Sequence, residues 1–283
     1  MSNENENQQT PDSCTHECGS CSSNCGERTA PQKLKVHENS NVKHVIGVVS
    51  GKGGVGKTLV TCLLASELQK KGFKVGILDA DATGPSIPRA FGVTGPLYAT
   101  DHQTLNPAVS ENGIKLISTN LLLPPDNEDS PIAWRGPLIT SMIDQFFTEV
   151  EWGELDYMLI DMPPGTSDVL LTVIQKLPVE SIVTVSAPQD LVSMIVGKAV
   201  NLAHNMGVQV KGIVENMSYF VCPDCEKKHY IFGEPQGEEL AKKYNIPSHA
   251  ELPLDPNFAN KVDHGKIEEY ELHGELDPII EAL

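Results

Sequence analysis

A C-x₂-C pair, Cys222 and Cys225, has the spacing of metal ligands. Thiolates at this spacing bind zinc or an iron-sulfur cluster, and both normally take four ligands. The pair follows a predicted buried strand, whereas a thioredoxin-type redox pair would lie at the start of a βαβ unit. Three alternatives remain: a zinc site with His229 as third ligand, a disulfide, and a site shared with a second copy of the chain.

The shared site requires only two-fold symmetry. In a two-fold dimer each residue near the axis meets its own copy or a close neighbour, so two thiols per chain become four. Four thiolates suit a [4Fe-4S] cluster as well as zinc. A disulfide is disfavoured if the chain is cytoplasmic, because thiols stay reduced in that compartment.

The segment CTHECGSCSSNC near the N-terminus carries a second set of thiols, with the spacing C-x₃-C-x₂-C-x₃-C. Its cysteines, Cys14, Cys18, Cys21 and Cys25, could hold a second cluster or a zinc ion without help from the rest of the chain. Cys62 lies in the apolar run LVTCLLA and is expected to be a core residue.

The segment SGKGGVGKT at residues 50–58 follows a predicted strand and opens a predicted long helix, as a P-loop requires. Glycines let backbone N–H groups converge on phosphate oxygens, and the helix N-terminus adds the positive end of its dipole. Lys57 would balance charge on the β and γ phosphates of ATP, and the Thr58 hydroxyl would coordinate Mg²⁺. The predicted nucleotide-binding residues of the loop are Gly51, Lys52, Gly53, Gly54, Val55, Gly56, Lys57 and Thr58.

Lys52 is an extra lysine that the general P-loop pattern does not require. With this lysine, the loop resembles the deviant Walker A motif of the MinD, ParA and nitrogenase iron protein group. The resemblance implies a homodimer in which Lys52 reaches the nucleotide of the partner subunit, so Lys52 and Lys57 are both candidate catalytic residues. Such a homodimer would also supply the second pair of thiols.

Carboxylates end two more predicted strands, at the edge of the sheet where α/β proteins bind ligands. Asp79 and Asp81 lie in ILDADATGPS, and by resemblance to the second motif of the deviant group Asp81 orients or activates the attacking water. Asp161 follows four apolar residues, as a Walker B aspartate that holds Mg²⁺ through water would. Gly165 and its neighbours would form a loop that senses the γ-phosphate.

The elements that must position these residues follow from hydrophobic patterning. Short apolar runs alternate with helical segments from Val42 onward, which is typical of βαβ units. We therefore expect an α/β fold, a P-loop NTPase of deviant Walker A type, with a mostly parallel central sheet flanked by helices on both faces. Strands are expected at residues 43–50, 74–80, 114–119, 156–162, 181–187 and 209–217. Helices are expected at residues 57–71, 131–150, 168–176, 189–206, 235–243 and at the C-terminus.

The composition separates a tail from a domain. Residues 1–33 contain no Leu, Ile, Val or Phe, so they cannot bury enough apolar surface to offset the entropy of ordering. We expect a disordered, cysteine-containing tail at residues 1–41 and an ATPase domain at residues 42–283, with the C-P-x-C insertion near residues 217–232.

The net charge of −17 repels phosphate backbones and anionic lipid, which argues against nucleic acid and membrane as partners. No apolar run reaches the roughly 18 residues of a membrane-spanning helix. The N-terminal residues also lack the hydrophobic core of a signal peptide, so a cytoplasmic location is expected.

A series of motifs extends the resemblance over residues 42 to about 258. In order they are GKGGVGKT, LDADATGPSIPR, WRGP, WGELDYMLIDMPPGTSD, SAPQDL, GIVENMSYFVCPDC and LPLDP. With them, the sequence resembles the Mrp/ApbC family of iron-sulfur cluster carrier or scaffold ATPases. The resemblance implies that Cys222 and Cys225 hold a labile [4Fe-4S] cluster at a homodimer interface, that Asn216 reads adenine, and that apo iron-sulfur proteins receive the cluster.

Two other functions share the nucleotide motif. A MinD/ParA-like spatial-organising ATPase with a structural zinc site would need a basic or amphipathic surface, yet the chain from Asp263 on has seven acidic residues and one lysine. An electron-donating iron protein shares the bridging cluster, but its cluster cysteines lie far apart in sequence, unlike Cys222 and Cys225. The carrier is therefore the leading hypothesis.

Overall fold

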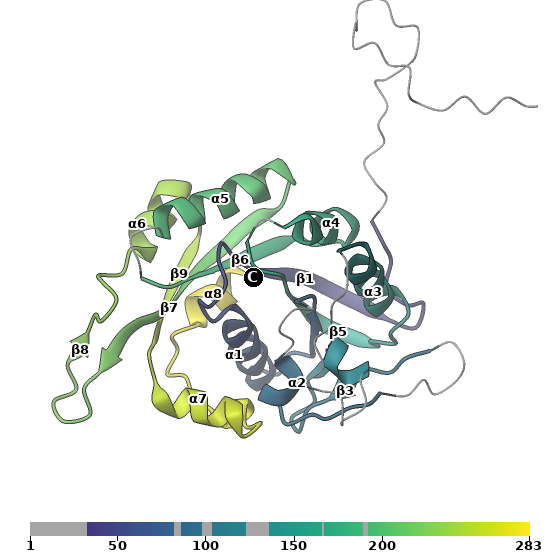
Figure 1. The fold of residues 1–283 in the computed structure, drawn as a ribbon, viewed down its shortest axis with the longest axis horizontal. Coiled ribbons are helices and arrows are strands. Elements are labelled where there is room, and N and C mark those ends of the chain that lie inside the picture. Colours follow the sequence, from purple (N-terminus) through teal and green to yellow (C-terminus); the bar gives the residue numbers. More distant parts are fainter. Residues whose placement is uncertain (1–32, 82–85, 98–103, 123–135, 166, 189–191) are drawn as a thin grey trace, which may run out of the picture. The chain divides into compact units, whose positions relative to one another are not determined.

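A mostly parallel β-sheet forms the centre of the body that spans residues 33–283 in a computed structural model of the protein (Figure 1). The structure describes residues 33–81, 86–97, 104–122, 136–165, 167–188 and 192–283. The cysteine-rich segment with Cys14, Cys18, Cys21 and Cys25 lies outside the described residues.

The described strands follow the predicted apolar runs. They are β1 (Asn41–Ser50), β2 (Val75–Asp79), β3 (Ala108–Val109), β4 (Lys115–Ile117), β5 (Glu154–Asp161), β6 (Ser181–Ser186), β7 (Gln209–Val221), β8 (Lys228–His229) and β9 (Ser248–Pro253). Their order across the sheet is β3-β4-β2-β5-β1-β6-β7, and both β8 and β9 pair with β7. All these pairs are parallel except β3 with β4 and β7 with β8.

Helices cover both faces of the sheet, which confirms the predicted fold class (Figure 1). They are α1 (Lys57–Lys70), α2 (Ile87–Ala90), α3 (Gly136–Thr148), α4 (Asp168–Lys176), α5 (Val192–Asn205), α6 (Gly237–Tyr244), α7 (Pro256–Asp263) and α8 (Asp277–Ala282), with 3₁₀ turns η1 (Thr119–Leu122) and η3 (Ile267–Glu269). One hydrophobic cluster unites α1, α2, α7 and α8 with one face, and a second unites α3, α4 and α5 with the other. Strands between two helical layers are buried on both sides, as every residue of β2 and β6 is.

Several elements differ from the sequence prediction. Strand β7 continues four residues beyond its predicted end, and β9 and α7 were not predicted. Strand β9 has the sequence SHAELP, in which buried and half-buried residues alternate, so it lacks the continuous apolar run of the central strands. None of the described helices is long and apolar enough to cross a bilayer.

The parallel register brings the ends of β1, β2 and β5 to the same edge of the sheet. Asp79 at the end of β2 is the direct partner of Asp161 at the end of β5, and Asp161 is also paired with Val48 of β1. Strand β1 then leads directly into the loop before α1. The sheet itself therefore places both carboxylates beside the predicted P-loop.

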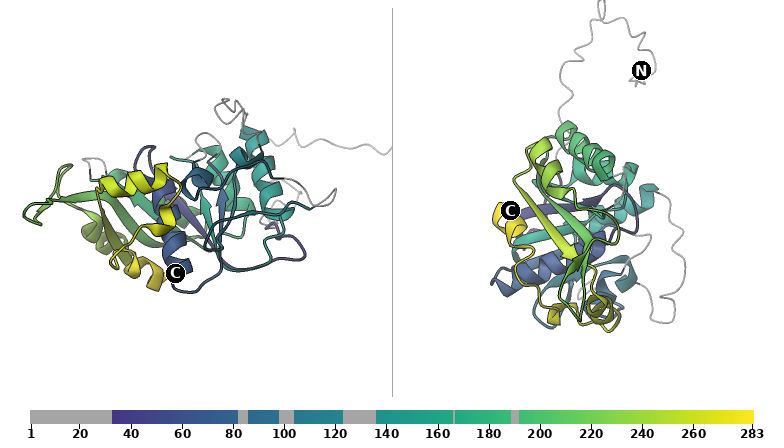
Figure 2. Two further views of the ribbon diagram at one scale, coloured as in Figure 1. Left: turned by 90° about the horizontal axis from the view of Figure 1, so that it is seen from below. Right: turned by 90° about the vertical axis from the view of Figure 1, so that its left-hand side faces the viewer.

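Strand β7 changes character near Met217. The backbone of Met217 is left-handed, with φ of 56°, and the register against β9 shifts between Glu215 and Tyr219. Beyond this bulge the strand turns back on itself as a short antiparallel hairpin with β8, in which Phe220 faces His229. The hairpin projects from the edge of the sheet, away from the helical layers (Figures 1 and 2).

Candidate nucleotide and metal sites

The loop between β1 and α1 has the backbone that a phosphate cradle needs. Gly54 and Gly56 have φ values of 79° and 81°, a left-handed conformation that other residues adopt only with strain. A Cβ built on Gly53 or Gly54 would meet no atom within 4 Å, so the loop backbone borders open space there. This open, glycine-lined face at a helix N-terminus fits the phosphates of a nucleotide.

Lys57, the first residue of α1, lies among carboxylates. Its ammonium Nζ is 2.8 Å from the carboxylate Oδ2 of Asp161 and 3.5 Å from Oδ2 of Asp81. The Lys57 side chain is only 6% exposed. A buried lysine is stable as a cation only beside negative charge, and these two aspartates supply it.

Asp161 is fully buried and accepts hydrogen bonds from two threonines of α1. The Thr58 hydroxyl donates to Oδ2 at 2.7 Å, and the Thr61 hydroxyl donates to Oδ1 at 2.8 Å. Burial raises the pKa of Asp161, while Lys57 and both hydroxyls act in the opposite direction. The adjacent Thr58 hydroxyl and Asp161 carboxylate are oxygen ligands of the kind that Mg²⁺ prefers.

Asp79 is buried directly beside Asp161. Its carboxylate accepts the Ser118 hydroxyl at 2.8 Å and the backbone N–H of Asp81 at 3.1 Å. Burial, and then the charge of Asp161, raise the pKa of Asp79 to about 8. Because two close carboxylates in a low dielectric cannot easily ionise together, Asp161 and burial both favour the protonated form of Asp79 in the nucleotide-free chain.

Thr61 and Ser118 were not singled out from the sequence. Thr61 lies one helical turn after Lys57 and also donates to the Lys57 carbonyl, so helical spacing from the P-loop lysine could have identified it. Ser118 follows β4, and only the pairing of β4 with β2 brings it to Asp79. This pairing of β4 with β2 could not be predicted from the residues around Ser118.

Lys52 and Gly165 both form a hydrogen bond with Ser50. The Ser50 hydroxyl donates to the Lys52 carbonyl at 3.0 Å, and the Gly165 N–H donates to the Ser50 carbonyl at 2.8 Å. Residue Lys52 is exposed at the surface of the loop. Its predicted reach to a partner subunit stays a prediction, as does the sensing role of Gly165.

Asn216 is buried against the P-loop. Its Nδ2 donates to the Val55 carbonyl at 3.0 Å, and a Cβ on Gly56 would lie 2.2 Å from the same nitrogen. The Asn216 side chain therefore packs against the backbone of the P-loop at Val55 and Gly56. The adenine-reading role that was expected for Asn216 stays a prediction.

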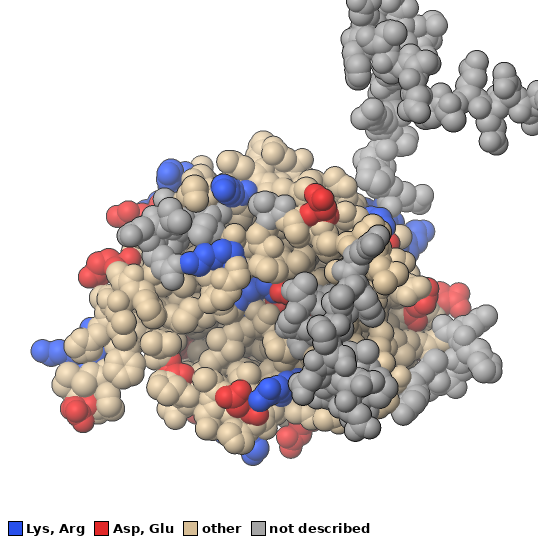
Figure 3. Space-filling view, viewed as in Figure 1, with Lys and Arg blue, Asp and Glu red and all other residues tan. Residues whose placement is uncertain are grey.

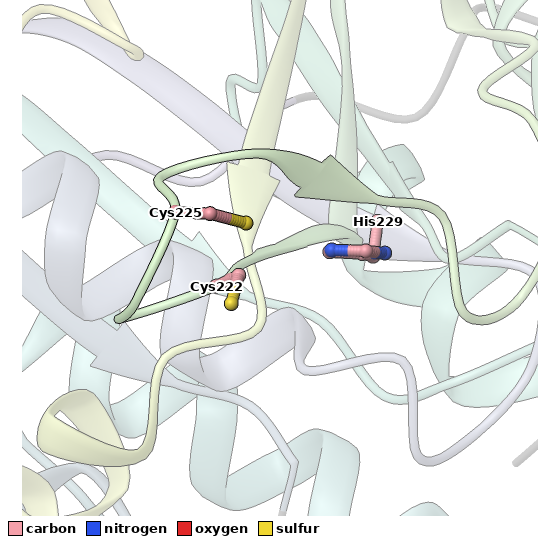
Figure 4. Close-up of side chains that lie close together, drawn as sticks. All are labelled: Cys222, Cys225 and His229. Carbon is pink, nitrogen blue, oxygen red and sulfur yellow. The ribbon is translucent and has the colours of Figure 1, made fainter.

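Cys222 and Cys225 lie together at the tip of the β7–β8 hairpin, with His229 beside them (Figure 4). One ligand atom from each of the three lies within 4.8 Å of the other two. Cys225 and His229 are exposed, and Cys222 is partly exposed. Backbone N–H groups of Asp224 and Cys225 point at the Cys222 sulfur and lower the pKa of this thiol, which favours the thiolate that binds metal.

Cys62, in contrast, is buried in α1 as expected. Its side chain belongs to the hydrophobic cluster that packs α1 on the sheet, and burial raises the pKa of its thiol. A neutral, enclosed thiol is a poor metal ligand. Among the described residues, the thiols able to reach a metal in solution are those of Cys222 and Cys225.

Apolar side chains lie at the end of β7 and in the segment that follows β8. The exposed ones are Val221, Tyr230, Ile231 and Phe232, with exposed fractions of 41%, 38%, 57% and 46%. On the face shown in Figure 3, the lysines and arginines among the described residues are scattered between acidic and uncharged residues.

Comparison with known proteins gives consistent matches. A model of the NUBPL iron-transfer P-loop NTPases, within the ParA group, matches residues 41–281. An iron-sulfur cluster carrier protein of Clostridium perfringens is 48% identical over 93% of this chain and 92% of its own length. The cytosolic Fe-S cluster assembly factor CFD1 of Chaetomium globosum is 42% identical over 82% of this chain and 80% of its own length.

Solved structures agree with the fold. A nucleotide-binding protein of Archaeoglobus fulgidus, solved in complex with ADP and with Co found by PIXE, is 46% identical and covers 82% of this chain and 90% of its own, with a TM-score of 0.73. The cell-division ATPase MinD of Pyrococcus furiosus is 21% identical over 84% of this chain and 96% of its own, with a TM-score of 0.54. The second similarity concerns the fold alone.

Proposed function

The chain belongs to the NUBPL iron-transfer family of P-loop NTPases, and from this premise we propose that it is an ATP-dependent carrier of [4Fe-4S] clusters. Two copies form a homodimer that holds one cluster between the Cys222 and Cys225 thiolates of both chains. The dimer then transfers the cluster to apo iron-sulfur proteins in the cytoplasm. Relatives named as cluster carriers, which align over nearly the whole chain, support the carrier role.

The observation that carries the proposal is the incomplete ligand set of the hairpin. Cys222 and Cys225 are accessible and close together, and they supply half of the four thiolates that a cubane cluster usually takes. Two-fold pairing of the hairpins completes the set. Exposed apolar side chains around the tip, including Val221 and Ile231, support burial against another protein surface.

The nucleotide site has residues for each step of ATP binding and hydrolysis. The amides around Gly53 and Gly54 bind phosphate oxygens, and Lys57 turns from Asp161 toward the β and γ phosphates. Thr58 and Asp161 would hold Mg²⁺, which would supply positive charge to neutralise the phosphates. Asp81, 3.5 Å from the Lys57 ammonium, orients the attacking water, and Lys52 of the partner subunit contacts the same nucleotide.

Anaerobic reconstitution with iron and sulfide tests the cluster site. The full chain with Cys14, Cys18, Cys21 and Cys25 replaced by serine should load one cluster per two chains, measured as iron, acid-labile sulfide and sedimentation mass. The additional change of Cys222 and Cys225 to serine should remove the cluster. Cys62→Ala is the matched control and should retain it, because Cys62 is enclosed in the core.

Two results would refute the shared site. One is a cluster that survives in the chain lacking both hairpin cysteines. The other is a cluster on a particle that sediments as a single chain, since one chain offers two accessible described thiols. Transfer itself is measured by activation of an apo-ferredoxin on addition of the loaded dimer.

A further inference from the structure

The three metal-binding side chains of the hairpin lie on the same side of it because of the strand register. His229 pairs directly with Phe220, and side chains of directly paired residues project to the same face of a sheet. Cys222 lies two residues after Phe220, so strand alternation places it on that face as well. The ladder continues to this point, because the Cys222 N–H donates to the Lys227 carbonyl at 3.0 Å.

A tight turn brings the third ligand back over the first. The Glu226 N–H donates to the Cys222 carbonyl at 2.8 Å, and Glu226 itself is left-handed with φ of 57°. This turn folds the Cys225 thiol above the strand pair, where it faces Cys222 and His229 (Figure 4). The three ligand atoms all come from one chain and lie within 4.8 Å of one another.

We propose that Cys222, Cys225 and His229 of a single chain bind one divalent transition-metal ion of the zinc class. Two thiolates and an imidazole form a borderline-soft ligand set, which selects zinc, cobalt or ferrous ions over magnesium or calcium. Ligand atoms around a tetrahedral ion of this class are about 3.5 Å apart. The ligand atoms lie within 4.8 Å of one another, so the exposed hairpin needs to close by no more than about 1.3 Å to reach this geometry.

The fourth coordination position of this site faces solvent. Cys225 and His229 are exposed, so water or an incoming thiolate can complete the tetrahedron. This mononuclear site requires no second chain, and it does not depend on the proposed cluster. The two forms nevertheless exclude each other, because both use the thiolates of Cys222 and Cys225. His229 belongs to the mononuclear form alone.

Cobalt titration distinguishes the two forms, because the visible bands of Co²⁺ report tetrahedral coordination and its thiolate charge-transfer absorption in the near ultraviolet increases with the number of bound thiolates. The protein is the full chain with the four tail cysteines changed to serine, titrated anaerobically with Co²⁺ and then with Zn²⁺ as competitor. We expect one Co²⁺ per chain, a spectrum of two thiolates, and sedimentation as a single chain at low protein concentration.

The variant His229→Ala should bind Co²⁺ at least about tenfold more weakly, since even the loss of an outer hydrogen-bond partner of a ligand costs about that much. Lys227→Ala is the control in the same hairpin and should bind as the parent does, because only the backbone of Lys227 takes part in the turn. The variant His229→Cys offers a replacement ligand and should restore tight binding with a spectrum of three thiolates. Circular dichroism establishes that each variant is folded.

The proposal is overturned if His229→Ala binds Co²⁺ as tightly as the parent. It is also overturned if the parent binds one Co²⁺ per two chains with a spectrum of four thiolates. Loading His229→Ala with iron and sulfide tests the mononuclear site separately from the proposed carrier function. A cluster that forms normally in this variant, together with weakened Co²⁺ binding, supports the mononuclear site as a distinct form.

Discussion

The P-loop site and the cysteine hairpin differ in what already surrounds their functional groups. At the P-loop, Asp161 is enclosed and contacts Lys57, Thr58 and Thr61 of the same chain. At the hairpin, Cys225 and His229 are exposed. Cys225 lies in the turn, and His229 belongs to β8, a strand of only two residues. The first site is held by the central sheet, whereas the second is held by a turn.

This difference matches two kinds of chemistry. Phosphoryl transfer depends on charges fixed before the reaction, and a buried site keeps them fixed because reorientation would leave polar groups without partners. A cargo that must leave requires the opposite, namely ligands that a competing thiol can approach from solvent. The comparison predicts that substitutions at the P-loop affect both activity and stability, while those at the hairpin affect metal binding alone.

The largest effect is expected for Lys57→Ala. Removal of this ammonium takes away the charge opposite the phosphates, and ATP hydrolysis should fall by about 10²–10³-fold, the usual loss for one preorganised electrostatic partner. Lys52→Ala is the paired variant, and under the proposed function it should lower hydrolysis while one chain still binds ATP. Phosphate release and equilibrium binding of a fluorescent ATP analogue measure the two steps. Hydrolysis at the parent rate in Lys57→Ala would contradict the preorganised site.

A pair of glycine substitutions tests how tightly the P-loop is supported. Gly54→Ala and Gly56→Ala impose the same left-handed strain, about 1–2 kcal/mol of unfolding free energy each. Gly56→Ala must also displace the Asn216 amide from the Val55 carbonyl, which should cost about 1–3 kcal/mol more because buried polar groups lose a partner. Urea unfolding of the nucleotide-free chain measures the difference. Equal losses in the two variants would show that Asn216 does not brace the loop.

Asp79 should make the stability of the nucleotide-free chain depend on pH. Its pKa is about 8 in the folded chain and 3.8 as an isolated group, so between these values the folded chain binds more protons than the unfolded chain. This contribution to stability is complete below about pH 4 and is lost as the pH rises through about 8. Asp79→Asn keeps a neutral side chain, so the loss of unfolding free energy from pH 5 to pH 8 should be smaller by at least about 1 kcal/mol.

The matched control for this pH effect is Asp224→Asn in the exposed hairpin turn. That variant should retain the slope of the parent chain in urea unfolding at each pH. A parent-like slope in Asp79→Asn would instead mean that another group holds the proton.

The smallest effect is expected when Cys222 and Cys225 are both changed to serine in the metal-free chain. Exposed side chains outside any network usually change the unfolding free energy by less than about 0.5 kcal/mol. Thermal unfolding in the presence of a chelator should therefore be nearly unchanged, although under the proposed function the same variant should bind no cluster. If the variant lost as much unfolding free energy as Gly56→Ala, the hairpin would contribute to the stability of the fold. The contrast drawn between the two sites would then be wrong.

The sequence predicted the elements whose cause is local. The P-loop lies between a strand and a helix as SGKGGVGKT requires, and the central strands coincide with continuous apolar runs. The helix α7 could also have been recognised, because Asp255 caps it and Pro256 is its first residue. Strand β9 could not, since its half-buried side carries the polar residues His249 and Glu251, and only its pairing with β7 makes it a strand.

The contacts between elements account for what sequence reasoning missed at the site. Ser118 reaches Asp79 only because β4 lies beside β2, and Asn216 reaches Val55 only because β7 passes beneath the P-loop. The sequence offered His229 as the third ligand in one of three alternatives, and only the strand register shows that it lies opposite Phe220. These contacts depend on the order of the strands in the sheet, and that order cannot be predicted from the local pattern of residues.

Strand β7 joins the nucleotide loop to the thiol pair through one continuous backbone, because Asn216 lies within the strand and Cys222 directly follows its last residue, Val221. Under the proposed function, a shift of the P-loop at Asn216 would pass along this backbone toward the hairpin. The left-handed residue Met217 lies directly after Asn216, and rotation there would take up part of the shift. The stiffness of the backbone at Met217 would then set how much of a nucleotide-driven displacement reaches the sulfur atoms.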